Sequence, residues 1–314
     1  MSELSRGAFF HVSAAAGAAA SLAAAPLEAA AATGVQLRMR WYGGGVYELA
    51  TADDKTIVLV DAWIWNNTGF TAFGIPKPAE LSSASAYAAH LKSRNPEAVI
   101  VALTHDHGDH MGDYFELLGA LTAAGIDVKT VGQSDLMRVA LPPKFKAANL
   151  DNTKLVLNNG AGINMGGSAR YKGVRLELVP AVHSTAAGFP AAGFIIDLGG
   201  TRIYASGDTD LYGDLALVGR RYQPAIAILS TGNGAFTMGP EDAATAVQIL
   251  GVPHAIPVHF AHNPLVIGPH CGDLFRAAVA RVAPHATVTV LTPGQPTTLT
   301  LPAVTALERA TPSA

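Results

Sequence analysis

Short apolar or alternating runs recur along the chain and predict β-strands. The sequence opens with three of them, at residues 35–41, 46–49 and 56–60, and Gly43, Gly44 and Gly45 turn the chain between the first two. Further runs lie at 99–103, 128–131, 174–180, 193–198, 201–205, 225–229 and 255–258. Residues 82–94, 112–124, 134–140 and 240–250 have helical patterns, and Pro142 and Pro143 are expected to break an insertion. Strands alternating with helices predict an α/β layer fold.

The segment from Thr104 to His110 carries the strongest chemical signal. It reads Thr-His-Asp-His-Gly-Asp-His and directly follows the apolar run 99–103, so it is expected to lie in a loop at the end of a strand. Three imidazoles and a carboxylate within six residues are typical of a metal site. The alternative is a polar loop that is rich in histidine without binding a metal.

Other ligand-type residues also follow predicted strands. His183 comes after the run 174–180, Asp208 after 201–205 and His259 after 255–258. Sheets of α/β proteins gather their sites at such strand ends, so these residues are expected to meet the first cluster. Asp61 closes the third strand, where it could orient a metal ligand or cap a turn.

Composition excludes several classes of partner. The chain has 314 residues, of which 49% are hydrophobic and 14% charged, which is enough apolar sequence for a large core. A net charge of -3 without any cluster of Lys or Arg argues against nucleic acid or an anionic membrane surface as partner. The single cysteine, Cys271, cannot form an internal disulfide. We expect a small-molecule substrate, and a homo-oligomer is compatible with the sequence.

The first 32 residues differ from the rest and are expected to be an export signal. Residues 7–25 contain no charged side chain and are mostly Ala, and Ala30, Ala31 and Ala32 provide a small-residue cleavage site. The segment 5–10 resembles the twin-arginine motif, with Gly7 in the place of the second Arg. Export to the periplasm or medium follows, without a permanent membrane span; an uncleaved extension on a cytoplasmic protein is the alternative. Residues 33–314 are expected to form the folded domain.

Several motifs together resemble the metallo-β-lactamase superfamily, and within it the metal-dependent hydrolases grouped with L-ascorbate-6-phosphate lactonase. The matching segments are 104–110, 162–167, 181–184, 205–209, 236–244 and 256–260. The resemblance implies a four-layer αββα sandwich with a dinuclear metal site between two similar halves. This chain departs from the pattern at one position: many relatives carry His after Trp-x-Gly near the first hairpin, whereas Gly44 follows Trp41-Tyr42-Gly43 here.

The resemblance also implies a ligand set and a reaction. His105, His107 and His183 would hold the first ion, Asp109, His110 and His259 the second, and Asp208 would bridge the two ions. Zinc suits this mixture of imidazoles and carboxylates best, and Mn or Fe is compatible with it. The expected reaction is hydrolysis by a hydroxide held between the ions, with Asp109 and Asp208 as the catalytic carboxylates and Asp109 orienting the hydroxide and passing its proton.

Substrate contacts are less well defined by the sequence. Trp63 and Trp65 could line a pocket or pack in the core, and His262 could face the substrate as a proton donor or cap the turn before Pro264. Tyr212, Asn233 and Phe236 are further pocket candidates.

Three classes of function remain in competition. Aromatic residues around 63–73 and the missing basic cluster favour a lactone or related carboxylic ester over a phosphodiester. An iron-dependent oxidoreductase of the same fold is a second class, disfavoured because the diiron reductases resembling this fold carry Glu where His107 stands. A non-catalytic binding protein is a third, disfavoured because all seven ligand positions are filled.

Overall fold

The computed structural model describes residues 34–233 and 235–302. The expected export signal therefore lies outside the described residues. Within them, no helix combines the length and the apolar character that crossing a bilayer requires.

The first sheet combines an antiparallel and a parallel part. Its strand order is β13-β1-β2-β3-β4-β5. Antiparallel pairing joins β13, β1, β2 and β3, and parallel pairing joins β3, β4 and β5. These strands span β1 (Val35–Gly43), β2 (Val46–Thr51), β3 (Thr56–Val60), β4 (Ala98–Ala102), β5 (Val128–Val131) and β13 (Pro296–Leu301). The β1–β2 turn uses positive φ angles of 105° at Gly43 and 53° at Gly44, which glycine adopts at little cost.

The second sheet repeats this plan. Its order is β12-β11-β10-β9-β8-β7-β6, with β9 to β12 parallel and β6 to β9 antiparallel. The strands are β6 (Ser168–Tyr171), β7 (Val174–Pro180), β8 (Ala192–Leu198), β9 (Thr201–Ala205), β10 (Ile226–Ser230), β11 (His254–Val258) and β12 (Thr287–Val288). Each sheet therefore has a parallel part, and parallel strands end together at one edge.

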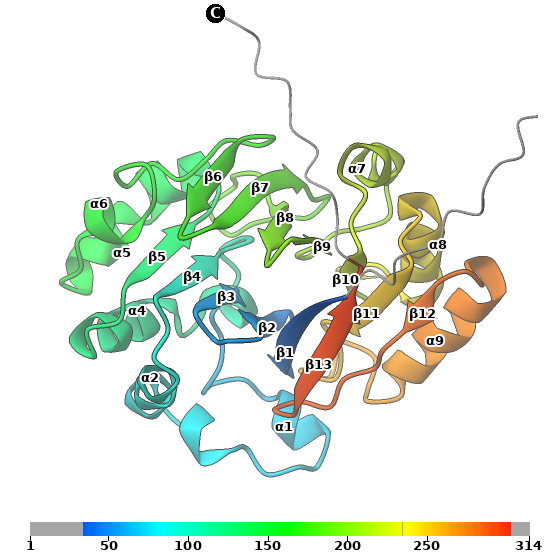
Figure 1. Ribbon diagram of the computed structural model, residues 1–314, viewed down its shortest axis with the longest axis horizontal. Coiled ribbons are helices and arrows are strands. Elements are labelled where there is room, and N and C mark those ends of the chain that lie inside the picture. The colour runs from blue at the N-terminus through cyan, green and yellow to red at the C-terminus, as the bar shows by residue number, and fades with distance from the viewer. Residues whose placement is uncertain (1–33, 234, 303–314) are drawn as a thin grey trace, which may run out of the picture. The chain divides into compact units, whose positions relative to one another are not determined.

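Three apolar cores define four layers (Figure 1). The central core joins the inner faces of the two sheets, as Leu37 and Val58 of the first sheet share it with Phe194 and Ile228 of the second. A second core packs the outer face of the first sheet against α2 (Ala84–Ser93), α4 (Tyr114–Ala123) and α5 (Pro142–Ala147). The third packs the outer face of the other sheet against α7 (Leu215–Tyr222), α8 (Pro240–Leu250) and α9 (Cys271–Val282). The expected αββα sandwich is confirmed.

Most predicted elements form near their expected bounds, and three segments differ. The helix expected over 112–124 forms as α4, and a short helix that was not expected, α3 (Gly108–Met111), begins inside the histidine motif just before it. The prediction that Pro142 and Pro143 break the chain was wrong: they open α5, where a missing N–H costs nothing in the first turn. The expected helix at 134–140 is a π-helical segment, η2 (Leu136–Ala140). The remaining short helices are α1 (Gly69–Ala72), η1 (Ala79–Leu81) and α6 (Asn152–Leu155).

Candidate metal centre

Ligand-type side chains from both sheets meet at the ends of their strands. Asp61 follows β3 and the segment 104–110 follows β4, while His183, Asp208 and His259 follow β7, β9 and β11. The structure brings all seven predicted ligands and Asp61 into one connected set of contacts. Their shared placement follows from the fold, because strands of the two sheets end at the same edge of the sandwich.

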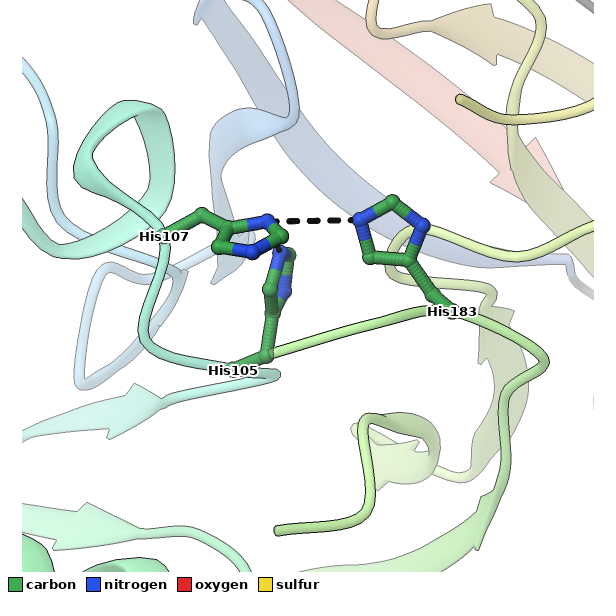
Figure 2. A group of neighbouring side chains, drawn as sticks. All are labelled: His105, His107 and His183. Carbon is green, nitrogen blue, oxygen red and sulfur yellow. Dashed lines mark hydrogen bonds between the residues drawn. The ribbon is translucent and has the colours of Figure 1, made fainter. Parts of the chain in front are cut away.

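His105, His107 and His183 form the first group of ligands. Figure 2 shows their rings turned toward one another, His105 and His107 coming from the loop after β4 and His183 from the loop after β7. The Nδ1 atom of His107 lies 3.0 Å from Nε2 of His105 and 3.3 Å from Nε2 of His183. Three ring nitrogens therefore converge on one point, as a metal ion with imidazole ligands requires.

A hydrogen-bond relay fixes which nitrogen of His105 faces the group. Asp61 is fully buried and accepts hydrogen bonds from the amide and the hydroxyl of Thr104, both at 2.8 Å. Because the Thr104 hydroxyl gives its only proton to Asp61, it must accept from Nδ1 of His105 at 3.0 Å. Nε2 of His105 then carries a free lone pair, the form in which imidazole binds metals.

The same carboxylate orients a second imidazole. Nδ1 of His110 donates to Asp61 at 2.7 Å, which turns Nε2 of His110 toward Asp208 at 3.2 Å. Asp61 adopts a left-handed backbone with φ of 63°, a strained conformation for a residue other than glycine. The structure thus places Asp61 where the sequence analysis expected a carboxylate that orients ligands.

Asp109, His259 and His262 form the second group of ligands. Oδ2 of Asp109 lies 3.5 Å from Nε2 of His259 and 3.3 Å from Nε2 of His262. All three side chains offer ligand atoms within 4.8 Å of one another. His110, which the resemblance assigns to the second ion, is grouped instead with His105 and Asp208.

Asp208 lies between the two groups. Its Oδ2 atom is 2.9 Å from Nε2 of His259, 3.2 Å from Nε2 of His110 and 3.7 Å from Nε2 of His183. Ser230 holds the other oxygen through a hydrogen bond of 3.0 Å. One carboxylate oxygen therefore reaches imidazoles on both sides of the centre, which is the placement a bridging ligand needs.

The donor atoms fit a metal. Within the described residues, both ring nitrogens of His259 and His262 and Nε2 of His110 are buried without a hydrogen-bond partner, although charge contacts surround them. Buried polar atoms are rarely left unpaired, and metal ions bound through one nitrogen of each ring would give these three imidazoles a partner. We conclude that this set of imidazoles and carboxylates suits a borderline divalent ion such as zinc.

Electrostatics distinguish the two groups. Burial lowers the pKa of His105 well below its usual value and also lowers that of His183, so these imidazoles are neutral. Burial also disfavours the charged forms of His110 and His259, but nearby carboxylates outweigh it. The pKa of His110 is therefore raised well above its usual value, and the pKa of His259 is raised to about 9. Burial alone would raise the pKa values of Asp109 and Asp208, yet the neighbouring imidazoles hold both of them low.

The predicted substrate contacts take different positions. Trp63 stands edge-on to His262 with ring centroids 6.1 Å apart, beside the second group. Trp65 donates from its indole to Glu116 at 3.1 Å, and Tyr212 donates to the carbonyl of Pro180 at 2.6 Å. Asn233 uses its amide within its own loop region, accepting from the amides of residues 235 and 236 and donating to the carbonyl of Leu265.

Sequence reasoning missed three residues that shape the centre. Asp106 accepts from the amides of Ala186 and Ala187, both at 2.8 Å, and so ties the loop after His183 to the histidine motif. Asp113 is buried and accepts from the amide of Ile64 at 2.5 Å, anchoring the loop of the two tryptophans. Asp106 lies inside the motif 104–110 and Asp113 three residues beyond it, so an acid in or next to a metal-binding segment is the signal that could have found them.

Gly45 is the third of these residues. A β-carbon at this position would lie 2.6 Å from Cε1 of His110 and 3.3 Å from Cδ2 of His259. The hairpin backbone therefore approaches the ligand rings more closely than any side chain allows. Sequence analysis had assigned this glycine only to a turn.

Comparisons with known proteins agree with this geometry. Residues 57–260 match the family described as the Beta-lactamase superfamily domain. A metal-dependent hydrolase from Nitratidesulfovibrio vulgaris is 31% identical over 266 residues, which cover 84% of this chain and 96% of that protein. One from Methanobrevibacter smithii is 30% identical over 270 residues, which cover 82% and 95%.

A solved structure extends the likeness to three dimensions. A metallo hydrolase from Ignicoccus hospitalis is 26% identical, with a TM-score of 0.65 and coverage of 84% of this chain and 98% of that one. Family match, relatives and ligand geometry all lead to one assignment. The chain belongs to the metallo-β-lactamase superfamily and is a metal-dependent hydrolase.

Proposed function

We propose that the protein is a two-zinc hydrolase that cleaves a lactone or a related carboxylic ester of a small molecule. The observation that carries the proposal is the convergence of two ligand groups on Asp208, whose Oδ2 atom lies within 3.7 Å of imidazoles of both. When bound by these residues, divalent ions would supply a water of lowered pKa, about 7, as the nucleophile and would polarise the carbonyl under attack.

The protein side chains around the centre have complementary roles in this reaction. His105, His107 and His183 would hold one ion, and Asp109 and His259 the other. Asp109 is the residue suited to orient the nucleophile and take up its proton, because it is one-third exposed whereas Asp208 is buried. No protein nucleophile is required.

Exposed apolar side chains beside the ligands favour an apolar substrate. Val182 precedes His183 in the chain and is 51% exposed, and Phe236 is 48% exposed on a loop bonded to Asn233. Leu265, 67% exposed, lies on the loop after His262, to which the amide of Asn233 also bonds. Large apolar residues that remain in solvent next to a site are typical of a surface that binds a ligand.

The ion pairs of the centre give no support to a phosphate ester. In residues 34–233 and 235–302, no Lys or Arg forms an ion pair with a carboxylate of the centre. Phosphate recognition commonly uses Arg or Lys in direct contact. We therefore rank carboxylic esters above phosphodiesters.

A substrate panel with protein of known metal content tests the proposal. Zinc-loaded protein should hydrolyse lactones, with a kcat/KM that rises with the length of an apolar substituent, and should act weakly on bis-aryl phosphodiesters. Metal-free protein is the control. Turnover of phosphodiesters alone would replace the ester assignment, and activity that requires iron and a redox partner would refute hydrolysis by zinc.

A further inference from the structure

His262 has a buried imidazole ring whose nitrogens have no hydrogen-bond partner among the described residues. Its side chain is only 1% exposed. Nε2 lies 3.3 Å from Oδ2 of Asp109, and the ring centroid lies 4.5 Å from that of His259. A buried imidazole without a partner loses its hydration and gains no interaction in return. A bound cation would provide that interaction.

The backbone is shaped to bring this ring to the centre. His259 and Ala261 both adopt left-handed conformations, with φ of 61° and 55°, which cost about 1–2 kcal/mol each for residues other than glycine. The hydroxyl of Thr68 donates to the carbonyl of His262 and holds the turn. Strain of this kind persists where a functional arrangement depends on it.

The turn that follows His262 is capped by the next residue, Asn263. Oδ1 of Asn263 accepts from the amide of Leu265 at 2.7 Å, which is the capping bond of the turn around Pro264. The imidazole of His262 forms no such bond to the backbone. Of the two roles considered for His262, capping therefore belongs to Asn263.

Gly44 lies directly against the ring of His262. A β-carbon at residue 44 would stand 3.5 Å from Cγ of His262 and 3.6 Å from Cζ3 of Trp63. The carbonyl of Gly44 accepts from the amide of His259 at 2.7 Å, so the hairpin is fixed to the loop of both histidines. The position at which the family resemblance leads us to expect a hairpin histidine therefore has no side chain here, and the ring of His262 lies against it.

We infer that His262 is an additional ligand of the second metal ion, and that it replaces a hairpin imidazole at position 44. The second ion would then be held by Asp109, His259 and His262, with Asp208 shared between the ions. The inference rests on the two-ion centre proposed above. In this arrangement, His262 supplies the imidazole that is missing at position 44.

Zinc binding to exchanged variants tests the inference without reference to turnover. We would measure zinc per chain by equilibrium dialysis over a range of free zinc for the wild type, His262→Ala and His262→Phe. The Phe variant preserves packing if Ala destabilises the loop. Both should keep one tight ion and weaken the second by at least about 10-fold.

The exchange itself has a matched control. Gly44→His combined with His262→Ala should recover the second ion, whereas Gly44→Ala combined with His262→Ala should not, although both carry the same backbone strain at φ of 53°. Wild-type affinity for two ions in both His262 variants would overturn the ligand role. Equal zinc binding by the two double variants would overturn the replacement. A wild type that binds a single ion would instead refute the two-ion centre itself.

Discussion

The two ligand groups of the centre differ in the charge they hold before any ion binds. The group of His105, His107 and His183 contains imidazoles alone, and burial lowers the pKa values of His105 and His183. In the other group, burial disfavours charge as well, but Asp208 and Asp109 raise the pKa of His259 to about 9. His105 and His183 offer free lone pairs, whereas His259 holds a proton that a metal ion must displace.

This difference predicts an order of binding. An ion entering the first group meets oriented neutral ligands, because the relay from Thr104 has already fixed the tautomer of His105. An ion entering the second group must first remove a proton from His259. We expect the first group to bind tightly over a wide pH range and the second to bind more weakly at low pH.

The largest effect is expected where the two groups meet. Asp208→Ala should lower both zinc content and kcat/KM, the latter by at least about 100-fold, because one oxygen of Asp208 contacts imidazoles of both groups. Metal analysis and lactone kinetics on the same preparation provide the measurement. Full activity at wild-type zinc content would contradict the two-ion arrangement.

Asp210→Asn is the matched control for this variant. Asp210 is exposed, lies two residues beyond Asp208, and its carboxylate accepts a hydrogen bond from the neighbouring amide of Leu211. Its replacement should leave zinc content and turnover unchanged. A comparable loss in both variants would indicate damage to the loop rather than loss of a bridging ligand.

A smaller effect is expected from Asp61→Asn, which removes orientation without removing a ligand. Three donors converge on Asp61: the amide and hydroxyl of Thr104 and Nδ1 of His110. An asparagine amide presents its NH2 to at least one of them, so a donor faces a donor whichever way it turns. We expect zinc affinity to fall about 10–100-fold while both ions can still bind at saturating zinc.

Asp54 supplies the control for Asp61. It has a similar left-handed backbone, with φ of 60° against 63°, but it pairs with Arg94 away from the centre. Asp54→Asn therefore reproduces the change of charge and the backbone context without touching the ligands. Unchanged zinc affinity in Asp61→Asn would show that the relay does not tune the centre.

Local patterns predicted which side chains meet at the centre, because these residues lie next to strand ends in the sequence. The motif 104–110 follows β4 directly, and its residues needed no knowledge of distant contacts. The relay could not be predicted in the same way. Asp61 and Thr104 meet because β3 and β4 pair in parallel with Val60 opposite Ala102, a register that the sequence does not specify.

Elements without a strong pattern were missed for related reasons. Strand β13 (Pro296–Leu301) pairs with β1 across most of the chain, begins with proline and has only one buried face. The role of His262 depends on the left-handed turn at Ala261, for which glycine would have been the usual signal. Tertiary contacts and backbone strain, rather than periodicity, decide these features.

The most modest effect concerns pH and tests the charge difference between the groups directly. The folded pKa of His259 is about 9, above its unfolded value of about 6.5, so metal-free protein gains stability from this protonated group below pH 6.5 and loses it as pH rises through 9. Its melting temperature should fall by at least about 2 °C over that interval. Zinc affinity should change in the opposite sense and rise with pH, because the ion competes with protons. Thermal melts with chelator or with buffered free zinc measure both trends. In metal-free protein, His259→Gln should flatten the dependence of the melting temperature on pH. His285→Gln changes an exposed residue and should preserve that dependence. If the melting temperature of the metal-free wild type instead rose from pH 6.5 to 9, the second group would not hold a proton in place of a metal.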